Sequence, residues 1–397
     1  MKYFNKPPEK YIAELNKYVD YSKHNDMVTR ARRAFNDKKP ERMLMELGIN
    51  ARYLILNGLY NKSGVDFKTY SENPRVMFEV QTEFRYFLNQ YMPFFHEMGN
   101  GAPIAIYVDF QNYSEAAWFC CPVLYPDGDV PYAKPLYTED NREAVFEKGM
   151  PEPFGGIFGR SLEYFQAFKE YAKDYEINGK KVDDIYASGS GTDGVFTLAC
   201  ELLGAETACA LLYEDEDYMR RLFDFITEAT VKRIKAFRKL NGEKEICAFG
   251  FADDSIALLS EDMYREAVLP YHKKLADALT SDGNVAGIHL CGDASRHFKT
   301  IQDELNCMSF DTGFPIDHEA VLRKLRPGTT MLGGPPVAFL EKASPAEVYN
   351  KVKEMALRLK KVSKYFIMRE ANNLPPSVPL TNVLAMYRAV AEYGVYD

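Results

Sequence analysis

The chain has 397 residues, of which 46% are hydrophobic and 27% charged, a composition typical of a folded globular protein that excludes a disordered or fibrous one. Its 49 basic and 57 acidic residues give a formal net charge of −8, and no lysine- or arginine-rich block offers the basic face that a nucleic-acid binder needs.

Neither a targeting signal nor a membrane span is visible in the sequence. Residues 1–18 are charged and lack the apolar stretch of a secretory signal, and no run of about 18 apolar residues occurs. The seven cysteines are an odd number scattered through apolar stretches, which is typical of reduced thiols and not of a disulfide framework. We therefore expect a cytoplasmic protein with no membrane and no nucleic-acid partner.

The first hundred residues are expected to be mostly helical, because apolar residues recur at helical spacing over residues 25–35 and 74–98. Beyond them, short β-rich runs alternate with amphipathic segments. The predicted strands are residues 104–110, 185–188, 246–251, 286–290, 308–311, 330–332 and 365–368, with an eighth at 53–56 or 117–120. The predicted helices are residues 215–240, 261–279, 318–325 and 345–361, the last opened by the capping sequence Ser344-Pro345-Ala346-Glu347.

Strands that alternate with helices run parallel, either in a doubly wound sheet or in a closed barrel. Neither a dinucleotide-binding glycine motif nor a GxxxxGK(S/T) phosphate loop follows any predicted strand, which favours the barrel. No proline- or serine-rich linker divides the chain. We predict one α/β domain over residues 1–397, a (β/α)8 TIM barrel with a mostly helical amino-terminal elaboration over residues 1–100. Its functional site would lie at the carboxyl ends of the strands.

His289 and Cys291 stand at the end of predicted strand 286–290. Side chains alternate along a strand, so these two point to the same side. An imidazole and a thiolate together form half of a Zn²⁺ site. A buried histidine bonded to the backbone, beside a small apolar cysteine, would give the same pattern. The expected position at the mouth of the barrel favours Zn²⁺.

A catalytic zinc ion needs a third protein ligand. Cys307 opens its strand and would lie at the opposite end of the barrel, whereas Glu370 and Asn372 follow the last predicted strand. We predict Glu370, because its carboxylate together with the Cys291 thiolate would neutralise the ion. With Asn372 instead, the site would keep a charge of about +1.

Aspartates also end the predicted strands. Asp253 and Asp254 follow strand 246–251 and Asp311 closes strand 308–311, and we predict that they position the substrate or protonate the departing group. Only one of the two adjacent aspartates can face inward. As alternatives, Asp253 and Asp254 cap the following helix or are solvated, and Asp311 caps the next helix. Asp109 is a weaker candidate of the same kind.

Four blocks of the sequence resemble the uroporphyrinogen decarboxylase superfamily. They are GVFTLACELL (194–203), ADDSIALLSEDMYREAVLPYHKKLADA (252–278), HLCGDASRHF (289–298) and PPSVPLTNVLAMY (375–387). The resemblance spans roughly residue 39 to the carboxyl terminus and implies an eight-stranded α/β barrel. The superfamily's decarboxylases share an amino-terminal Pro-x-Trp-x-Met-Arg-Gln-Ala-Gly-Arg motif whose arginines hold substrate carboxylates. This chain lacks the motif, and its single tryptophan, Trp118, has a different context.

Corrinoid-dependent methyltransferases form a second branch, which is similar to this chain in the His-x-Cys element. The resemblance implies that His289 and Cys291 bind Zn²⁺. The branch's third ligand, usually a cysteine just before the Pro-Pro of the last strand loop, falls at Asn372. An oxygen donor in its place makes the metal a harder Lewis acid, which suits an ether oxygen better than a thiol.

The resemblance therefore implies a zinc-dependent methyltransferase that moves a methyl group between a small methylated substrate, such as a methyl ether, and the cobalt of a corrinoid. The chain lacks the Asp-x-His-x-x-Gly signature of a cobalamin-binding domain and leaves no room for one, so we expect the corrinoid on a separate partner protein. One alternative is a uroporphyrinogen-decarboxylase-like lyase acting on a carboxylated small molecule, and another is a barrel that binds a ligand without chemistry. A homodimer is one option for its assembly.

Overall fold

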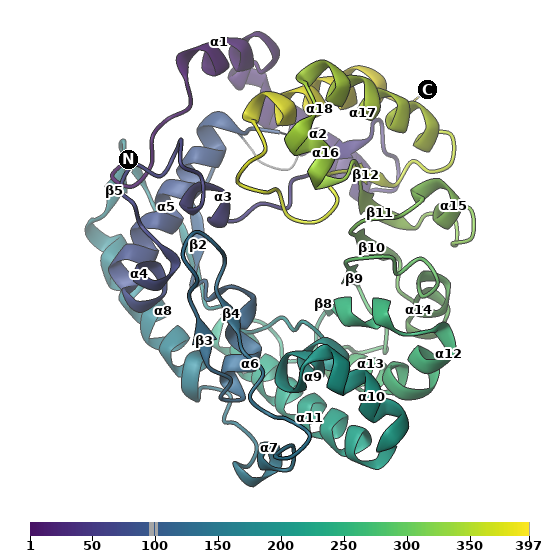
Figure 1. Cartoon of the computed structure of the whole chain (residues 1–397). Coiled ribbons are helices and arrows are strands. Elements are labelled where there is room, and N and C mark those ends of the chain that lie inside the picture. The colour runs from purple at the N-terminus through teal and green to yellow at the C-terminus, as the bar shows by residue number, and fades with distance from the viewer. Residues whose placement is uncertain (95–98, 100–101, 397) are drawn as a thin grey trace.

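The computed structural model describes residues 1–94, 99 and 102–396. Within them, eight short parallel strands lie inside a ring of helices (Figure 1). Six strands form one sheet in the order β1-β12-β11-β10-β9-β8, and β2 pairs with β7 in a second sheet. The strands are β1 (Leu44–Met45), β2 (Ala105–Tyr107), β7 (Asp184–Tyr186), β8 (Gly250–Ala252), β9 (Gly287–Leu290), β10 (Ser309–Thr312), β11 (Thr330–Gly333) and β12 (Phe366–Met368). Their parallel pairing is that of the predicted (β/α)8 barrel.

Helices connect successive strands in the first half of the barrel. Between β1 and β2 lie α3 (Arg52–Ile55), α4 (Phe67–Glu72) and α5 (Pro74–Tyr91). Between β2 and β7 lie α6 (Ser114–Trp118), α7 (Ala144–Glu147) and α8 (Gly156–Asp174), with two small hairpins, β3 (Val123–Leu124) with β4 (Tyr132–Ala133) and β5 (Glu176–Ile177) with β6 (Lys180–Lys181). Between β7 and β8 lie α9 (Val195–Leu203), α10 (Ala205–Glu214) and α11 (Glu216–Leu240).

Helices also connect successive strands in the second half of the barrel. The connecting helices are α12 (Glu261–Met263), α13 (Leu269–Leu279), α14 (Phe298–Leu305), α15 (His318–Leu322), α16 (Val337–Lys342) and α17 (Pro345–Leu359). In addition, α18 (Leu380–Tyr393) follows β12, and α1 (Glu9–Tyr18) and α2 (Tyr21–Asn36) precede β1. No single described helix is long and apolar enough to cross a membrane, and α9 with α10 reaches that length only across a bend of 108°.

The capping box predicted at the start of residues 345–361 is confirmed in α17 (Pro345–Leu359): the Ser344 hydroxyl accepts a hydrogen bond from the Glu347 backbone N–H, and the Glu347 carboxylate accepts one from the Ser344 N–H.

The predicted helix 261–279 contains a π-helical segment (Tyr264–Val268) just before Pro270, which has no N–H with which to continue the regular bonding pattern. The predicted helix 74–98 is observed as α5 only up to Tyr91: residues 92–94 lie beyond its end, and residues 95–98 lie outside the described residues.

The seven strands predicted beyond residue 100 are confirmed in position, but the eighth was wrong. Residues 53–56 lie in and just after α3, residues 117–120 lie at the end of α6, and the missing strand is β1. Because β1 has only two residues, it carries no alternating pattern that a sequence could show. Most of the described residues among the first hundred lie in helices, and through β1 this segment also completes the barrel.

Alternating burial along the central strands determines which side chains reach the mouth of the barrel. Ile288 and Phe310 are buried in the core, whereas their neighbours His289 and Asp311 are only half-buried and point to the other side. The parallel register pairs His289 with Asp311 of β10 on one side and with Ala252 of β8 on the other. Groups at the carboxyl ends of β8, β9 and β10 are thereby brought together.

Candidate metal centre

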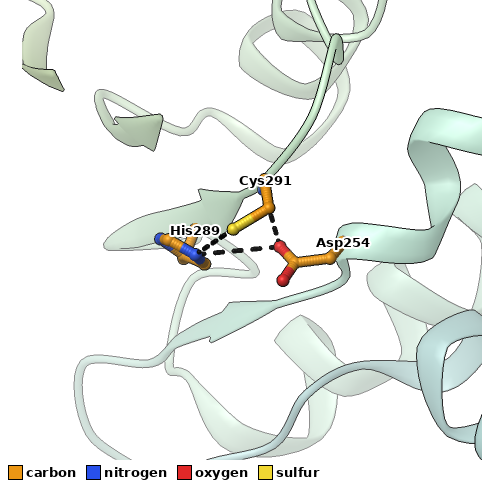
Figure 2. Close-up of side chains that lie close together, drawn as sticks. All are labelled: Asp254, His289 and Cys291. Carbon is orange, nitrogen blue, oxygen red and sulfur yellow. Dashed lines mark hydrogen bonds and ion pairs between the residues drawn. The ribbon is translucent and has the colours of Figure 1, made fainter. Parts of the chain in front are cut away.

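His289 and Cys291 come together as their spacing predicted. His289 is the third residue of β9 and Cys291 directly follows the strand. The imidazole Nε2 lies 3.0 Å from the Cys291 Sγ, and Figure 2 shows the two side chains turned toward each other. The thiol and the imidazole are therefore close enough to serve as two ligands of one metal ion.

Asp254 is the third member of this cluster. It opens a 3-10 turn (Asp254–Leu258) directly after β8, the strand beside β9. Its Oδ1 accepts a hydrogen bond of 2.7 Å from the Cys291 backbone N–H and lies 3.8 Å from the His289 Nε2 (Figure 2). The carboxylate oxygen, the imidazole nitrogen and the thiol sulfur all lie within 4.8 Å of one another.

Asp311 supports the histidine from the other side. Its Oδ2 lies 2.8 Å from the His289 Nδ1 and also accepts a hydrogen bond of 2.8 Å from Arg369 Nη1. Burial opposes protonation of His289, but its hydrogen bonds with Asp311 and Cys291 outweigh burial and raise the pKa of His289 to about 10. Burial also raises the pKa of the Cys291 thiol. A metal that binds here would have to displace these protons.

The three donors fit a zinc ion. Zn²⁺ accepts imidazole nitrogen, thiolate sulfur and carboxylate oxygen, and three protein ligands leave its fourth position open for a substrate. The Asp311 contact to Nδ1 leaves Nε2 to face the cluster, which is the usual arrangement around a metal-binding histidine.

Glu370, the predicted third ligand, is not part of the cluster. Its side chain is fully buried, and its Oε1 accepts hydrogen bonds from the Gly48 N–H at 2.7 Å and from Arg369 Nη2 at 3.3 Å. Burial raises the pKa of Glu370 to about 8. The alternative residue, Asn372, contributes its backbone oxygen to Arg369 at 3.2 Å. The Arg369 guanidinium thus contacts Glu370, Asn372 and Asp311. The carboxylate that lies with His289 and Cys291 is that of Asp254, not that of Glu370.

Asp253 faces away from its neighbour Asp254. It is fully buried, and its carboxylate contacts His272 Nε2 at 2.8 Å and accepts hydrogen bonds from the backbone N–H groups of Phe196 and Thr197 at the start of α9. The expectation that only one of the two aspartates faces inward is met by Asp254. The catalytic role predicted for Asp253 does not fit this position, because its oxygens are used to hold α9.

Two residues near the cluster were missed in the sequence. Arg369 directly precedes the predicted Glu370, and only its contacts reveal it. Asp193 lies in the loop after β7, where burial, followed by the charges of Glu115 and Asp254, raises its pKa to about 7. An acid just after the predicted strand 185–188 was the signal that could have identified Asp193.

Comparisons with known proteins agree with this fold. A methyltransferase from Methanosarcina mazei of known structure superimposes with a TM-score of 0.61 at 16% identity, covering 91% of this chain and 97% of that one. Among curated proteins, a methylated-thiol–coenzyme M methyltransferase of Methanosarcina mazei is 28% identical over 208 residues, 51% of this chain and 53% of the relative. The chain therefore matches about half the length of that relative.

A second curated relative, the methylcobamide:CoM methyltransferase MtbA of Methanosarcina acetivorans, is 24% identical over 246 residues, which cover 62% of this chain and 68% of the relative. The family model for uroporphyrinogen decarboxylase (URO-D) matches residues 113–393. This match covers more than half of the chain and includes the Asp254, His289 and Cys291 cluster. The chain belongs to the uroporphyrinogen decarboxylase (URO-D) family, as its sequence blocks predicted, and the relatives named here are methyltransferases.

Proposed function

We propose that this protein is a zinc-dependent methyltransferase that moves a methyl group between a small methylated substrate and the cobalt of a corrinoid held by a separate partner protein. The observation that carries the proposal is the convergence of Asp254, His289 and Cys291 at the carboxyl ends of β8 and β9. Two relatives, a methylated-thiol–coenzyme M methyltransferase and a methylcobamide:CoM methyltransferase, support the same class of reaction.

Each residue of the site has a separate part in this proposal. Asp254, His289 and Cys291 would hold the metal, and Asp311 keeps the imidazole in the orientation that exposes Nε2. When bound, Zn²⁺ supplies Lewis acidity toward the heteroatom that carries the methyl group. The remaining chemistry would take place at the carboxyl ends of the strands, where we propose that the corrinoid protein docks.

The donor set favours an oxygen-linked methyl group. A site with one sulfur, one nitrogen and one carboxylate oxygen is harder than a site with two thiolates, so it is better matched to an ether oxygen than to a thiol. We therefore propose a methyl ether as the substrate and its demethylation as the reaction. Asp254 now supplies the oxygen donor on which this argument depends.

We propose a cytoplasmic location for the protein, because all seven cysteines are free thiols, as in a reducing compartment. Assembly as a homodimer stays a prediction.

Metal analysis and a methyl-transfer assay test the function together. Protein purified with zinc should carry about one equivalent, which His289→Ala and Cys291→Ser should remove, while Cys307→Ser, a buried thiol outside the cluster, should retain it. The zinc-loaded protein should methylate cob(I)alamin from a methoxylated aromatic compound, measured by absorbance. Zinc that stays in both variants, or a zinc-free protein that decarboxylates a porphyrinogen, would contradict the proposal.

A further inference from the structure

A cavity of about 380 Å³ lies beside the metal centre, at the carboxyl ends of β2 and β7. We call it the β2–β7 cavity. Asp193, in the loop after β7, lines it and links it to the cluster. The carbonyl of the preceding residue, Thr192, accepts a hydrogen bond of 3.1 Å from the N–H of Ala252 at the end of β8, and Asp254 follows two residues later. The loop that carries Asp193 is thereby bonded to the end of β8, from which Asp254 follows, although none of the three cluster residues lines the cavity itself.

Arg233 is the only cation among the described residues that line the cavity, and its charge is already neutralised. Its side chain is 1% exposed, forms an ion pair with Glu115, and donates hydrogen bonds to the carbonyls of Gly189 at 2.6 Å and Gly191 at 3.0 Å. Glu115 in turn accepts a hydrogen bond of 2.6 Å from the Asp193 backbone N–H. The ion pair holds the loop in place and offers no free positive charge to a ligand.

Asp193 is different, because its carboxylate has no hydrogen-bond or ion-pair partner among the described residues. Asp109, another acid on the wall, accepts hydrogen bonds from Tyr70 at 2.9 Å and from Gln81 at 3.1 Å. A divalent ion in the metal centre would not offset Asp193, because Asp254 and Cys291 would already balance its charge. Asp193 therefore gives the cavity an unpaired carboxyl group, which carries a negative charge above its pKa of about 7.

Aromatic side chains complete the wall of the cavity. Tyr107, Phe110 and Phe158 all line it. Aromatic faces pack against flat rings and attract cations, and a carboxylate beside them strengthens the preference for positive charge. The lining is thus suited to a flat ligand that carries a cationic group.

We propose that the β2–β7 cavity binds the substrate and that Asp193 selects a methylated aromatic compound bearing an ammonium group over one bearing a carboxylate. The identification of this ligand as the methyl donor rests on the proposed function. The charge preference of the cavity does not, because it follows from the lining residues alone.

Calorimetric titration of the zinc-loaded 397-residue protein with three matched probes, at about pH 8.5 where Asp193 is ionised, tests the proposal. The probes are 4-methoxybenzylamine, 4-methoxybenzyl alcohol and 4-methoxybenzoate. The amine should bind at least about tenfold more tightly than the benzoate, with the alcohol between them. Asp193→Asn should weaken binding of the amine about tenfold and affect the alcohol little. The exposed Asp262→Asn in α12, an equal change of charge away from the cavity, should leave all three unchanged.

Benzoate that binds as tightly as the amine, binding of none of the probes, or an unchanged preference in Asp193→Asn would overturn the proposal. If Asp193→Asn does not fold, the ratio of amine to benzoate affinity in the wild-type protein decides the question. Methyl transfer is measured separately with the same probes. Selective binding of the amine without methyl transfer would support the charge preference of the cavity and refute the proposed function. Methyl transfer without a charge preference would support the proposed function and refute the role of the cavity.

Discussion

The Nδ1 atom of His289 lies 2.8 Å from the Oδ2 of Asp311, and the two residues are register partners on the neighbouring strands β9 and β10. Asp311 therefore contacts the candidate metal centre through His289, and no described interaction joins it to Asp254 or Cys291. Asp311 is thus bonded to the imidazole nitrogen that does not face Asp254 and Cys291, whereas the sequence predicted that it positions the substrate or protonates the departing group.

Asp311→Asn should lower the affinity for zinc about 10- to 100-fold, because the amide orients the imidazole less strongly than the carboxylate does. Competition with a zinc chelator measures the affinity. Asp303→Asn, an exposed acid paired with Lys299 in α14, provides the matched control and should bind zinc normally. An Asp311→Asn protein with unchanged zinc affinity would show that the contact does not support the metal.

The identity of the third ligand can be decided by two amide variants. Asp254→Asn should lose zinc on dialysis against a weak chelator, with an affinity lowered about 100-fold, since it removes a charged donor from the centre. Glu370→Gln should retain zinc, because Glu370 contacts Gly48 and Arg369 and none of the donors. Elemental analysis of both proteins is sufficient. The reverse pattern would restore Glu370 as the ligand.

Glu370 should also make the stability of the metal-free protein depend on pH. Burial raises its pKa from 4.5 to about 8, so the folded protein binds this proton more tightly than the unfolded chain. The protonated Glu370 therefore makes its full contribution to the free energy of unfolding below about pH 4.5, and this contribution is lost as the pH rises toward 8. Glu370→Gln should destabilise the protein less at pH 8.5 than at pH 5, as urea unfolding can measure. A larger cost at high pH would mean that Glu370 is ionised and paired with Arg369.

Asp253→Ala should destabilise the fold without emptying the metal centre. The substitution leaves His272 and the first N–H groups of α9 without their acceptor in the core, which we expect to cost about 3 kcal/mol in the free energy of unfolding. Chemical denaturation gives this value, and elemental analysis should still find zinc. Loss of zinc at unchanged stability would return Asp253 to the site.

Several features of the fold followed from local patterns in the sequence. The alternation of short β-rich runs with amphipathic segments predicted seven of the eight strands and the barrel that they form, because each of these runs stands out by its composition between turn residues. β1 was missed because two residues carry no period, and its place in the sheet depends on pairing with β12. The capping box at Ser344 was predicted because its four residues interact only with one another.

That His289 and Cys291 lie together follows from their spacing alone, since residues two apart along extended chain share a side. The sequence by itself could not decide which third group joins them. Asp254 is 37 positions from Cys291 and reaches it only because β8 lies beside β9, while Asp253 is turned away by its bonds to α9. The charge at Asp193 likewise has consequences only because folding pairs Arg233 with Glu115 and leaves Asp193 without a counterion among the described residues. Contacts between distant segments arise from tertiary packing, which no local pattern records.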